Sequence, residues 1–139
     1  MDCIFCDVIA GKTPAFFVYE DDDYVAIMDK YPIHRGHTLL IPRIHHEKIL
    51  DMPTNLVGAL FSKVPLIAKG VVEATQADGF NVGQNNGRAA NQIVPHVHVH
   101  VIPRYKNITT AWPKRTLADD NDLRSLAEKI RKCIDLTVK

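Results

Sequence analysis

The sequence predicts a single α+β domain, and three observations carry this prediction. The chain has 139 residues, of which 46% are hydrophobic, and this length and composition suit one compact core. Short runs rich in β-branched and aromatic residues alternate with turn residues, as is typical of strands. Two longer segments repeat apolar residues at helical spacing, and the chain shows no internal repeat and no linker. We therefore expect one domain over residues 1–139.

Five segments have the composition of strands. The first two are separated by four acidic residues, which indicates a hairpin with an acidic turn. Proline bounds the third and the fifth, and a polar loop follows the fourth. The expected strands cover residues 15–19, 24–28, 37–41, 79–83 and about 92–102.

Two segments have the periodicity of helices. Apolar residues recur at helical spacing through residues 54–77, where Thr54 can cap the first turn. Pro65 lies inside this segment and should kink the helix or divide it, because proline lacks a backbone N–H and clashes with the preceding turn. A C-terminal helix with one apolar face is expected over about 119–136. Residues 3–10 form a short, mildly apolar segment that Gly11 ends, and no element is assigned to it.

The charge balance and the cysteine count exclude several classes of protein. With 17 basic and 16 acidic side chains, the formal charge of +1 is too small to attract nucleic acid or an anionic membrane surface. No apolar run approaches the roughly 18 residues of a membrane span, and the N-terminus has no signal-peptide pattern. Three cysteines, two of them in Cys3-x-x-Cys6, do not resemble a secreted disulfide framework. We therefore expect a cytoplasmic protein without a nucleic-acid or membrane partner.

The histidines are the most informative residues. There are 7 of them, and all lie within residues 34–46 or 96–100. The second group alternates His with Val, so in a strand the three imidazoles share one face, about 6–7 Å apart, and the valines share the other, buried face. Three buried imidazoles would each need a hydrogen-bond partner, which is costly in a dry interior. Their strict alternation opposite an apolar stripe favours a functional site over a plain solvated sheet face.

Two chemistries suit such a row of imidazoles. Neutral imidazole is a common metal ligand. It is also a nucleophile that can attack phosphorus and form a phosphoramidate, provided that its other nitrogen donates to a carbonyl and fixes the tautomer. In the second case the middle residue, His98, is the natural nucleophile, and its neighbours can bind the phosphate oxygens. The chain has no H-E-x-x-H pattern, which makes a zinc-protease site a weak alternative.

The segment His96-Val97-His98-Val99-His100-Val101-Ile102 resembles the signature of the histidine triad (HIT) superfamily. The similarity is greatest to its Hint-like bacterial branch and covers a core of about residues 3–104, which leaves a C-terminal extension and helix at about 105–139. Further matching positions are Cys3–Asp7, Met28–Asp29, Gly36–Thr38, Ile41–Arg43 and Asn85–Gly87. The resemblance implies a HIT-like fold, with a five-stranded antiparallel sheet, a long kinked helix and a C-terminal helix, and it implies a homodimer.

The resemblance also implies an activity. A protein of this type cleaves at the α-phosphate of nucleoside phosphoramidates or related conjugates and takes a purine nucleotide of the AMP or GMP type. His98 matches the nucleophile, which forms a nucleotidyl-histidine that water hydrolyses. His100 matches the histidine that contacts the phosphate, and His96 matches the one that supports the site.

Five other residues match nucleotide-binding positions of the family. Asp29 matches the residue that holds the ribose hydroxyls, a role that suits a carboxylate acceptor. Ile27 is a candidate wall of the base pocket, although a plain core position explains it equally well. His37 matches a histidine beneath the triad, and Asn85 and Gln92 match amides near the phosphate.

The Cys-x-x-Cys supplies two metal ligands at the spacing of zinc sites. In the bacterial branch, and in the related galactose-1-phosphate uridylyltransferases, this motif pairs with two histidines that match His45 and His96. The resemblance therefore implies a structural zinc on Cys3, Cys6, His45 and His96, with no open coordination position. The alternative is that the cysteines are small buried residues and His45 a surface side chain.

Departures from the family pattern leave two alternative functions open. Ile93 stands where many relatives have the Ser or Thr that assists the leaving group, and Asn91 stands where glycine is common. A mild basic patch at 104–106 and 114–115 would suit a dinucleoside polyphosphate hydrolase. A nucleotide-binding regulator with vestigial catalysis is the other alternative. Trp112 is a candidate contact with the site of a neighbouring subunit or with the dimer interface.

Overall fold

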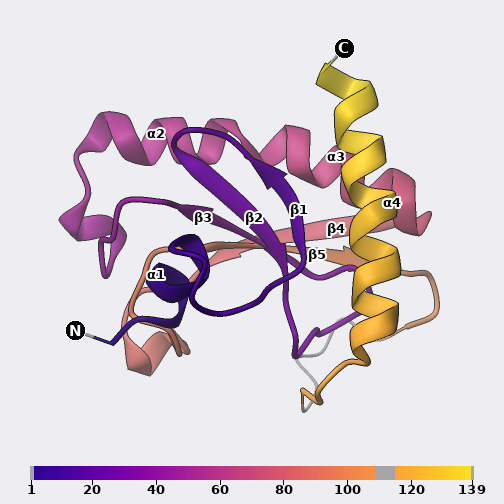
Figure 1. Ribbon diagram of the computed structural model, residues 1–139, viewed down its shortest axis with the longest axis horizontal. Coiled ribbons are helices and arrows are strands. Elements are labelled where there is room, and N and C mark those ends of the chain that lie inside the picture. Colours follow the sequence, from indigo (N-terminus) through magenta and orange to yellow (C-terminus); the bar gives the residue numbers. More distant parts are fainter. Residues whose placement is uncertain (1, 109–114, 139) are drawn as a thin grey trace.

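The computed structural model describes residues 2–108 and 115–138, and in these residues a five-stranded antiparallel sheet occupies the centre of the fold (Figure 1). Its strand order is β1-β2-β3-β5-β4. The strands are β1 (Phe17–Glu20), β2 (Tyr24–Met28), β3 (Thr38–Pro42), β4 (Gly79–Gln84) and β5 (Val99–Arg104). The helices are α1 (Ile4–Ile9), α2 (Thr54–Ser62), α3 (Val64–Thr75) and α4 (Asp120–Val138), with short 3₁₀ helices η1 (Ile49–Asp51) and η2 (Arg88–Ala90). The predicted α+β fold with an antiparallel sheet is confirmed.

The sheet is covered on both faces, so all residues of its central strands β2 and β3 are buried. One face packs against α2, α3 and α4 through residues such as Leu40 and Val101. The other face packs against α1 through Ile27 and Leu39. Figure 1 shows the long helices on one side of the sheet and the short α1 on the other. Alternation along each strand therefore divides the core into two layers, and the thinner layer under α1 borders the histidines.

The predicted helix over 54–77 is two helices, as the position of Pro65 indicated. The break falls at Lys63, and Pro65 occupies the first turn of α3, where its missing N–H is not needed. Thr54 is not the cap: Pro53 stands at the cap position, and Thr54 is the first helical residue. By length and composition alone, the segment Thr54–Thr75 is apolar enough to cross a membrane, a property that it shares with core helices of soluble proteins.

The expected strand over 92–102 is wrong in its first half, because β5 begins only at Val99. Pro95 has no N–H for a ladder, and the Val97 N–H donates instead to the His46 carbonyl at 2.8 Å. The strand also continues through Pro103, which was expected to end it. At this position β5 pairs only with β4, because its pairing with β3 ends at Val101. His96 and His98 therefore lie in the irregular segment that enters the strand rather than within it.

The segment at residues 3–10 contains a helix that the sequence did not predict. Cys3 caps α1, because its sulfur accepts a hydrogen bond from the Cys6 N–H at 3.4 Å. Phe5 and Val8 pack α1 against the sheet. At the other end of the chain, α4 packs on α3 at Gly70, where any side chain would overlap Ile134. These two contacts bring both chain ends to the central sheet.

Candidate functional site

The three histidines of residues 96–100 point away from the buried valines, as predicted. Val97, Val99 and Val101 are all in the core beneath the long helices. His96, His98 and His100 are also buried, with exposed fractions of 0%, 6% and 4%. The ring centroids of His98 and His100 are 4.9 Å apart. Because these rings are buried, their hydrogen-bond partners determine which nitrogen carries the proton.

The partner of His98 makes its outer nitrogen a base. Its Nδ1 lies 2.7 Å from the His96 carbonyl oxygen, and since a carbonyl can only accept, Nδ1 carries the proton. The lone pair of the neutral ring is then on Nε2. Burial lowers the pKa of His98, so the ring is neutral at pH 7. The Phe5 ring lies edge-on to His98, with centroids 5.0 Å apart, and restricts its rotation.

His100 has the opposite tautomer. The Ile33 N–H donates to Nδ1 of His37 at 3.0 Å, so His37 carries its proton on Nε2. That nitrogen lies 2.9 Å from Nδ1 of His100, which must accept, so the proton of a neutral His100 is on its Nε2. Burial lowers the pKa of His37 to about 2 and that of His100 to about 3, which keeps both rings neutral. His98 therefore presents a lone pair, and His100 presents a hydrogen-bond donor.

A cavity of about 530 Å³ opens beside these two rings, large enough for a drug-sized ligand. Its apolar wall comes from α1 and from the central strands. Its polar groups are fewer and include the two histidines. The apolar residues include Ile4, Phe5, Val8, Ile27 and Leu39, and the polar ones include Asp29, Asn85, Asn91, His98, His100 and Arg115.

Asp29 is the buried carboxylate of this cavity. Its Oδ1 accepts from the Tyr31 N–H at 2.8 Å, and its Oδ2 accepts from Arg115 and lies 3.5 Å from Nε2 of His37. Burial raises the pKa of Asp29, and the Arg115 guanidinium opposes this shift. Asp29, His37 and His100 are close enough together to share a metal ion, but His37 carries a proton on the nitrogen that would have to bind it. His37 and His100 are therefore joined by a hydrogen bond, and Asp29 lies beside this pair.

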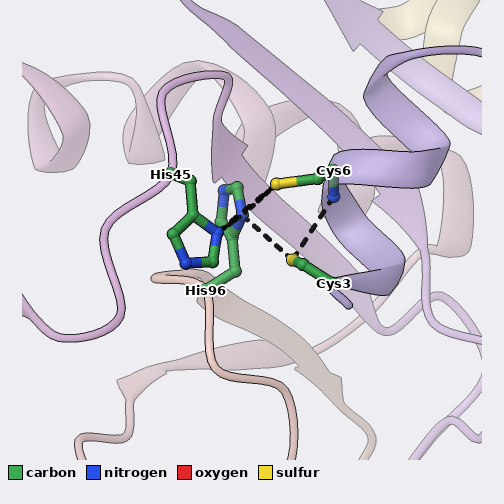
Figure 2. A group of neighbouring side chains, drawn as sticks. All are labelled: Cys3, Cys6, His45 and His96. Atoms are coloured by element: carbon green, nitrogen blue, oxygen red, sulfur yellow. Dashed lines mark hydrogen bonds between the residues drawn. The ribbon is translucent and has the colours of Figure 1, made fainter. Parts of the chain in front are cut away.

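A second cluster lies on the other side of His96 (Figure 2). Cys3, Cys6, His45 and His96 point toward one another, and their donor atoms all lie within 4.8 Å. Nε2 of His96 lies 2.8 Å from the Pro42 carbonyl oxygen and must donate to it, which leaves the lone pair of Nδ1 facing the cluster. Burial lowers the pKa of His96 to about 4, so this lone pair is available near neutral pH.

The spacing of these four atoms suits a tetrahedral metal ion. Nδ1 of His96 lies 3.1 Å from Nδ1 of His45 and 3.4 Å and 3.6 Å from the sulfurs of Cys3 and Cys6. With metal–sulfur bonds of about 2.3 Å and metal–nitrogen bonds of about 2.0–2.1 Å, tetrahedral ligands stand about 3.3 Å apart for two nitrogens and about 3.5 Å apart for nitrogen and sulfur. All four ligand positions come from protein, so the ion would have no open coordination site.

Comparison with known proteins identifies the family. A family model described as the HIT domain matches residues 10–107, which is more than half of the chain. The chain belongs to the HIT family. It is 43% identical over 116 residues to adenylylsulfatase HINT3 of Arabidopsis thaliana, covering 84% of this chain and 58% of that protein. It is 34% identical over 137 residues to adenosine 5'-monophosphoramidase HNT1 of Candida albicans, covering 94% and 90% of the two chains.

Solved structures of HIT proteins have the same fold. A Hit-like protein of Bartonella henselae, described as involved in cell-cycle regulation, superposes with a TM-score of 0.88 at 39% identity, over 95% of this chain and 96% of the other. A zinc-bound histidine triad family protein of Mycobacterium smegmatis superposes with a TM-score of 0.87 at 33% identity, over 99% and 96% of the two chains. The HIT-like fold and the Hint-like resemblance that the sequence indicated are therefore confirmed.

The HIT cavity brings together most of the residues expected to bind nucleotide. Ile27, Asp29 and Asn85 line it. His37 lies beneath His100 and reaches the cavity only through that ring. Gln92 lies outside the lining, because its amide accepts from the Gly87 N–H and donates to the carbonyls of residues 47 and 94. Direct contact of Gln92 with a phosphate is therefore not supported by the geometry, and its amide fastens the loop after β4.

Two residues of the HIT site were missed in the sequence. Phe5 packs on the central imidazole, and its place in the unpredicted α1 hid this role. Arg115 appeared only as part of a basic patch, yet it lies in the cavity on the carboxylate of Asp29. Asn91, by contrast, has the left-handed conformation expected where relatives have glycine, with φ of 67°. Trp112 lies outside the described residues.

The buried, neutral His37 makes the HIT fold sensitive to acid. Its folded pKa lies near 2 and its unfolded value near 6.5, so the unfolded state binds more protons as the pH falls. Stability is then lost below about pH 6.5, at up to about 1.4 kcal/mol per pH unit for this group. His37→Gln keeps a donor for His100 but removes the titration. We expect the free energy of urea unfolding to fall less steeply from pH 6 to pH 4 in this variant than in the wild type; equal slopes would contradict the assignment.

Proposed function

We propose that this protein is a nucleotide hydrolase or transferase that cleaves nucleoside phosphoramidates or related conjugates at the α-phosphate through His98. One observation carries the proposal: the hydrogen bond from Nδ1 of His98 to the His96 carbonyl leaves the Nε2 lone pair beside the cavity. The names of the Arabidopsis and Candida relatives, an adenylylsulfatase and an adenosine 5'-monophosphoramidase, support cleavage next to an adenylyl group.

The reaction has two steps. In the first, Nε2 of His98 attacks the α-phosphorus, and the bond from phosphorus to the leaving group breaks with its electron pair on the leaving group. The Nε2–H of His100 is positioned to bind the phosphate oxygens as charge develops. In the second step, water attacks the nucleotidyl-histidine, the P–N bond breaks, and its electron pair returns to Nε2. The leaving group takes a proton from solvent and the attacking water returns one to solvent, so the products are a nucleoside monophosphate and the protonated leaving group.

The cavity offers a place for each part of a mononucleotide. The base would lie against the apolar side chains of Phe5, Ile27 and Leu39, which line the cavity. The ribose hydroxyls would donate to the Asp29 carboxylate. Asn85 can donate its amide to the phosphate without adding charge.

Loss of the nucleophile is the direct test. We expect His98→Ala to release AMP from adenosine 5'-phosphoramidate at least about 10⁴-fold more slowly than the wild type, because no other group forms the intermediate. His34→Ala is the matched control, since His34 packs on Tyr105 outside the cavity lining, and it should keep wild-type activity. Equal rates in the wild type and His98→Ala would refute the nucleophile.

A second candidate function is cleavage of conjugates whose leaving group departs as a stable anion, such as a sulfate or a polyphosphate. Ile93 is 75% exposed at the cavity rim, and its hydrocarbon side chain cannot give a proton to a departing amine. Ile93 also borders a second cavity of about 290 Å³, which Lys48 and Arg88 line.

The ratio of kcat/KM for diadenosine tetraphosphate to kcat/KM for the phosphoramidate distinguishes the two functions. Lys48→Gln should lower this ratio only if the second cavity receives the anion.

We also propose that the metal at the Cys3 cluster is zinc and that its role is structural. The thiolate and imidazole donors and their tetrahedral spacing support zinc, as does the zinc-bound Mycobacterium relative. Because all four positions would be filled by protein, the ion would tie α1 to the segment before β5 and take no part in bond breaking.

Metal content and stability test this role. We expect about one zinc per chain by elemental analysis, lost in Cys6→Ser because a hydroxyl is a poor replacement for a thiolate. Thermal unfolding of the metal-free protein should begin several degrees lower, since metal binding is coupled to folding. Cys133→Ser, at a cysteine outside the cluster, should keep both properties. A zinc-free wild type with an unchanged Tm would show that the metal is not structural.

We propose, finally, that the protein is a homodimer that pairs two sheets along β4. This strand is an edge of the sheet, and Phe80 and Val82 on it are 45% and 43% exposed.

We expect light scattering to give twice the chain mass for the wild type and a single chain mass for Val82→Asp, because a charge on this edge opposes pairing. Leu136→Asp on α4 is the control and should stay dimeric. A monomeric wild type would contradict the proposal.

A further inference from the structure

Arg115 reaches the nucleotide cavity from a part of the chain that the HIT family match does not cover. The match ends at residue 107, and Arg115 precedes the C-terminal helix α4. Its side chain is only 25% exposed and lines the cavity. Nη2 of Arg115 donates to Oδ2 of Asp29, and Nε donates to the Tyr31 carbonyl. The guanidinium therefore bridges a buried carboxylate and the backbone two residues further on.

The main chain holds this arginine in place. The Ala118 N–H donates to the Lys30 carbonyl at 2.8 Å, so the segment before α4 is bonded to the loop that follows β2. Together with the two bonds of Arg115, this contact fastens residues 115–118 along residues 29–31. The C-terminal extension thereby reaches the site, and Arg115 is the side chain that it contributes to the carboxylate.

Asp29 depends on this cation. Its side chain is 9% exposed, and its other close partners, the Tyr31 N–H and His37, are uncharged, because His37 stays neutral with a pKa near 2. Lys30 also lines the cavity but is exposed to solvent. A buried carboxylate without a counter-charge takes up a proton more readily, since burial raises its pKa. The Tyr31 N–H, Arg115 and, when it is protonated, His98 oppose this rise in the pKa of Asp29, and Arg115 is the cation that contacts the carboxylate directly.

The bonds of Asp29 leave room for two donors. A carboxylate accepts at about four lone-pair positions. Among the described residues, Tyr31 occupies one position on Oδ1 and Arg115 one on Oδ2, while the His37 proton is directed to His100. One lone pair on each oxygen then remains, which is the pattern that two neighbouring hydroxyls of a ribose require.

We propose that Arg115 is a positioning residue that keeps Asp29 ionised and oriented for a ribose diol, so that the C-terminal extension sets the preference for ribonucleotides. This inference rests on the proposed nucleotide function of the same cavity. Arg115 acts through Asp29 and the sugar.

Calorimetric binding of AMP and of 2',3'-dideoxy-AMP to the intact protein tests the proposal without requiring turnover. The wild type should favour AMP by about tenfold or more, as expected for hydrogen bonds to a charged acceptor. Arg115→Met fills similar space without the charge, and we expect it to lose most of this preference at pH 7 while its affinity for the dideoxy nucleotide stays the same. Asp29→Asn should lose the preference at every pH.

The pH dependence separates an effect through Asp29 from a merely structural one. Loss of the Arg115 charge should raise the pKa of Asp29 further, so in Arg115→Met the preference for AMP should increase as the pH rises. Arg35→Met is the matched control, because Arg35 also pairs with an aspartate, Asp122 on α4 at 3.1 Å, and both side chains are about half exposed. Arg35→Met should keep the wild-type preference at every pH.

Three outcomes would overturn the proposal. Arg115→Met could keep the full preference for AMP, or it could weaken AMP and dideoxy-AMP equally, which would indicate a phosphate contact or loss of structure. The wild type could also bind neither nucleotide, in which case the proposed function fails as well. If the wild type prefers AMP through Arg115 but hydrolyses neither adenosine 5'-phosphoramidate nor diadenosine tetraphosphate, the hydrolase proposal fails and the role of Arg115 stands.

Discussion

His96 is the residue on which the site depends, because it makes three bonds in three directions. Its Nε2 donates to the Pro42 carbonyl, which turns the Nδ1 lone pair toward the two cysteines and His45. Its own backbone carbonyl accepts a hydrogen bond from the Nδ1–H of His98. The side chain of His96 therefore belongs to the Cys/His cluster, while its backbone carbonyl sets the tautomer of His98. Any ion that draws this cluster together would stiffen the carbonyl that keeps Nε2 of His98 unprotonated.

The sequence predicted those features that a local pattern determines. The alternation of His and Val specified which side chains face the core, and it did so although the strand begins only at Val99, because the extended segment before β5 keeps the same alternation. Pro65 marked the break between α2 and α3. The Cys-x-x-Cys motif and His45 and His96 indicated the metal cluster, but only the resemblance to a family linked positions that are about ninety residues apart in the chain.

Features that depend on long-range contacts could not be predicted. Helix α1 is six residues long, too short to show a helical period, and it is stabilised by packing on the sheet rather than by propensity. Arg115 lies in an irregular segment, 86 positions from the carboxylate that it contacts. Gln92 is an amide in the expected loop, but its bonds to three backbone groups turn it away from the cavity. For Arg115 and Gln92 the residue type was evident in the sequence, but the group that each side chain contacts was not.

The hydrogen bonds of His98 and His100 also explain how identical side chains, two positions apart on one face, come to present a lone pair in one case and an N–H in the other. His98 donates inward to a backbone carbonyl and so accepts outward, whereas His100 accepts inward from His37 and so donates outward. The difference originates in groups that cannot change their polarity, the carbonyl of His96 and the N–H of Ile33. A lone pair and a hydrogen-bond donor thus stand on rings whose centroids are 4.9 Å apart, and neither requires a charge on the ring. Asp29 and Arg115 form an ion pair in the same cavity, so the charge that each brings there is balanced by the other.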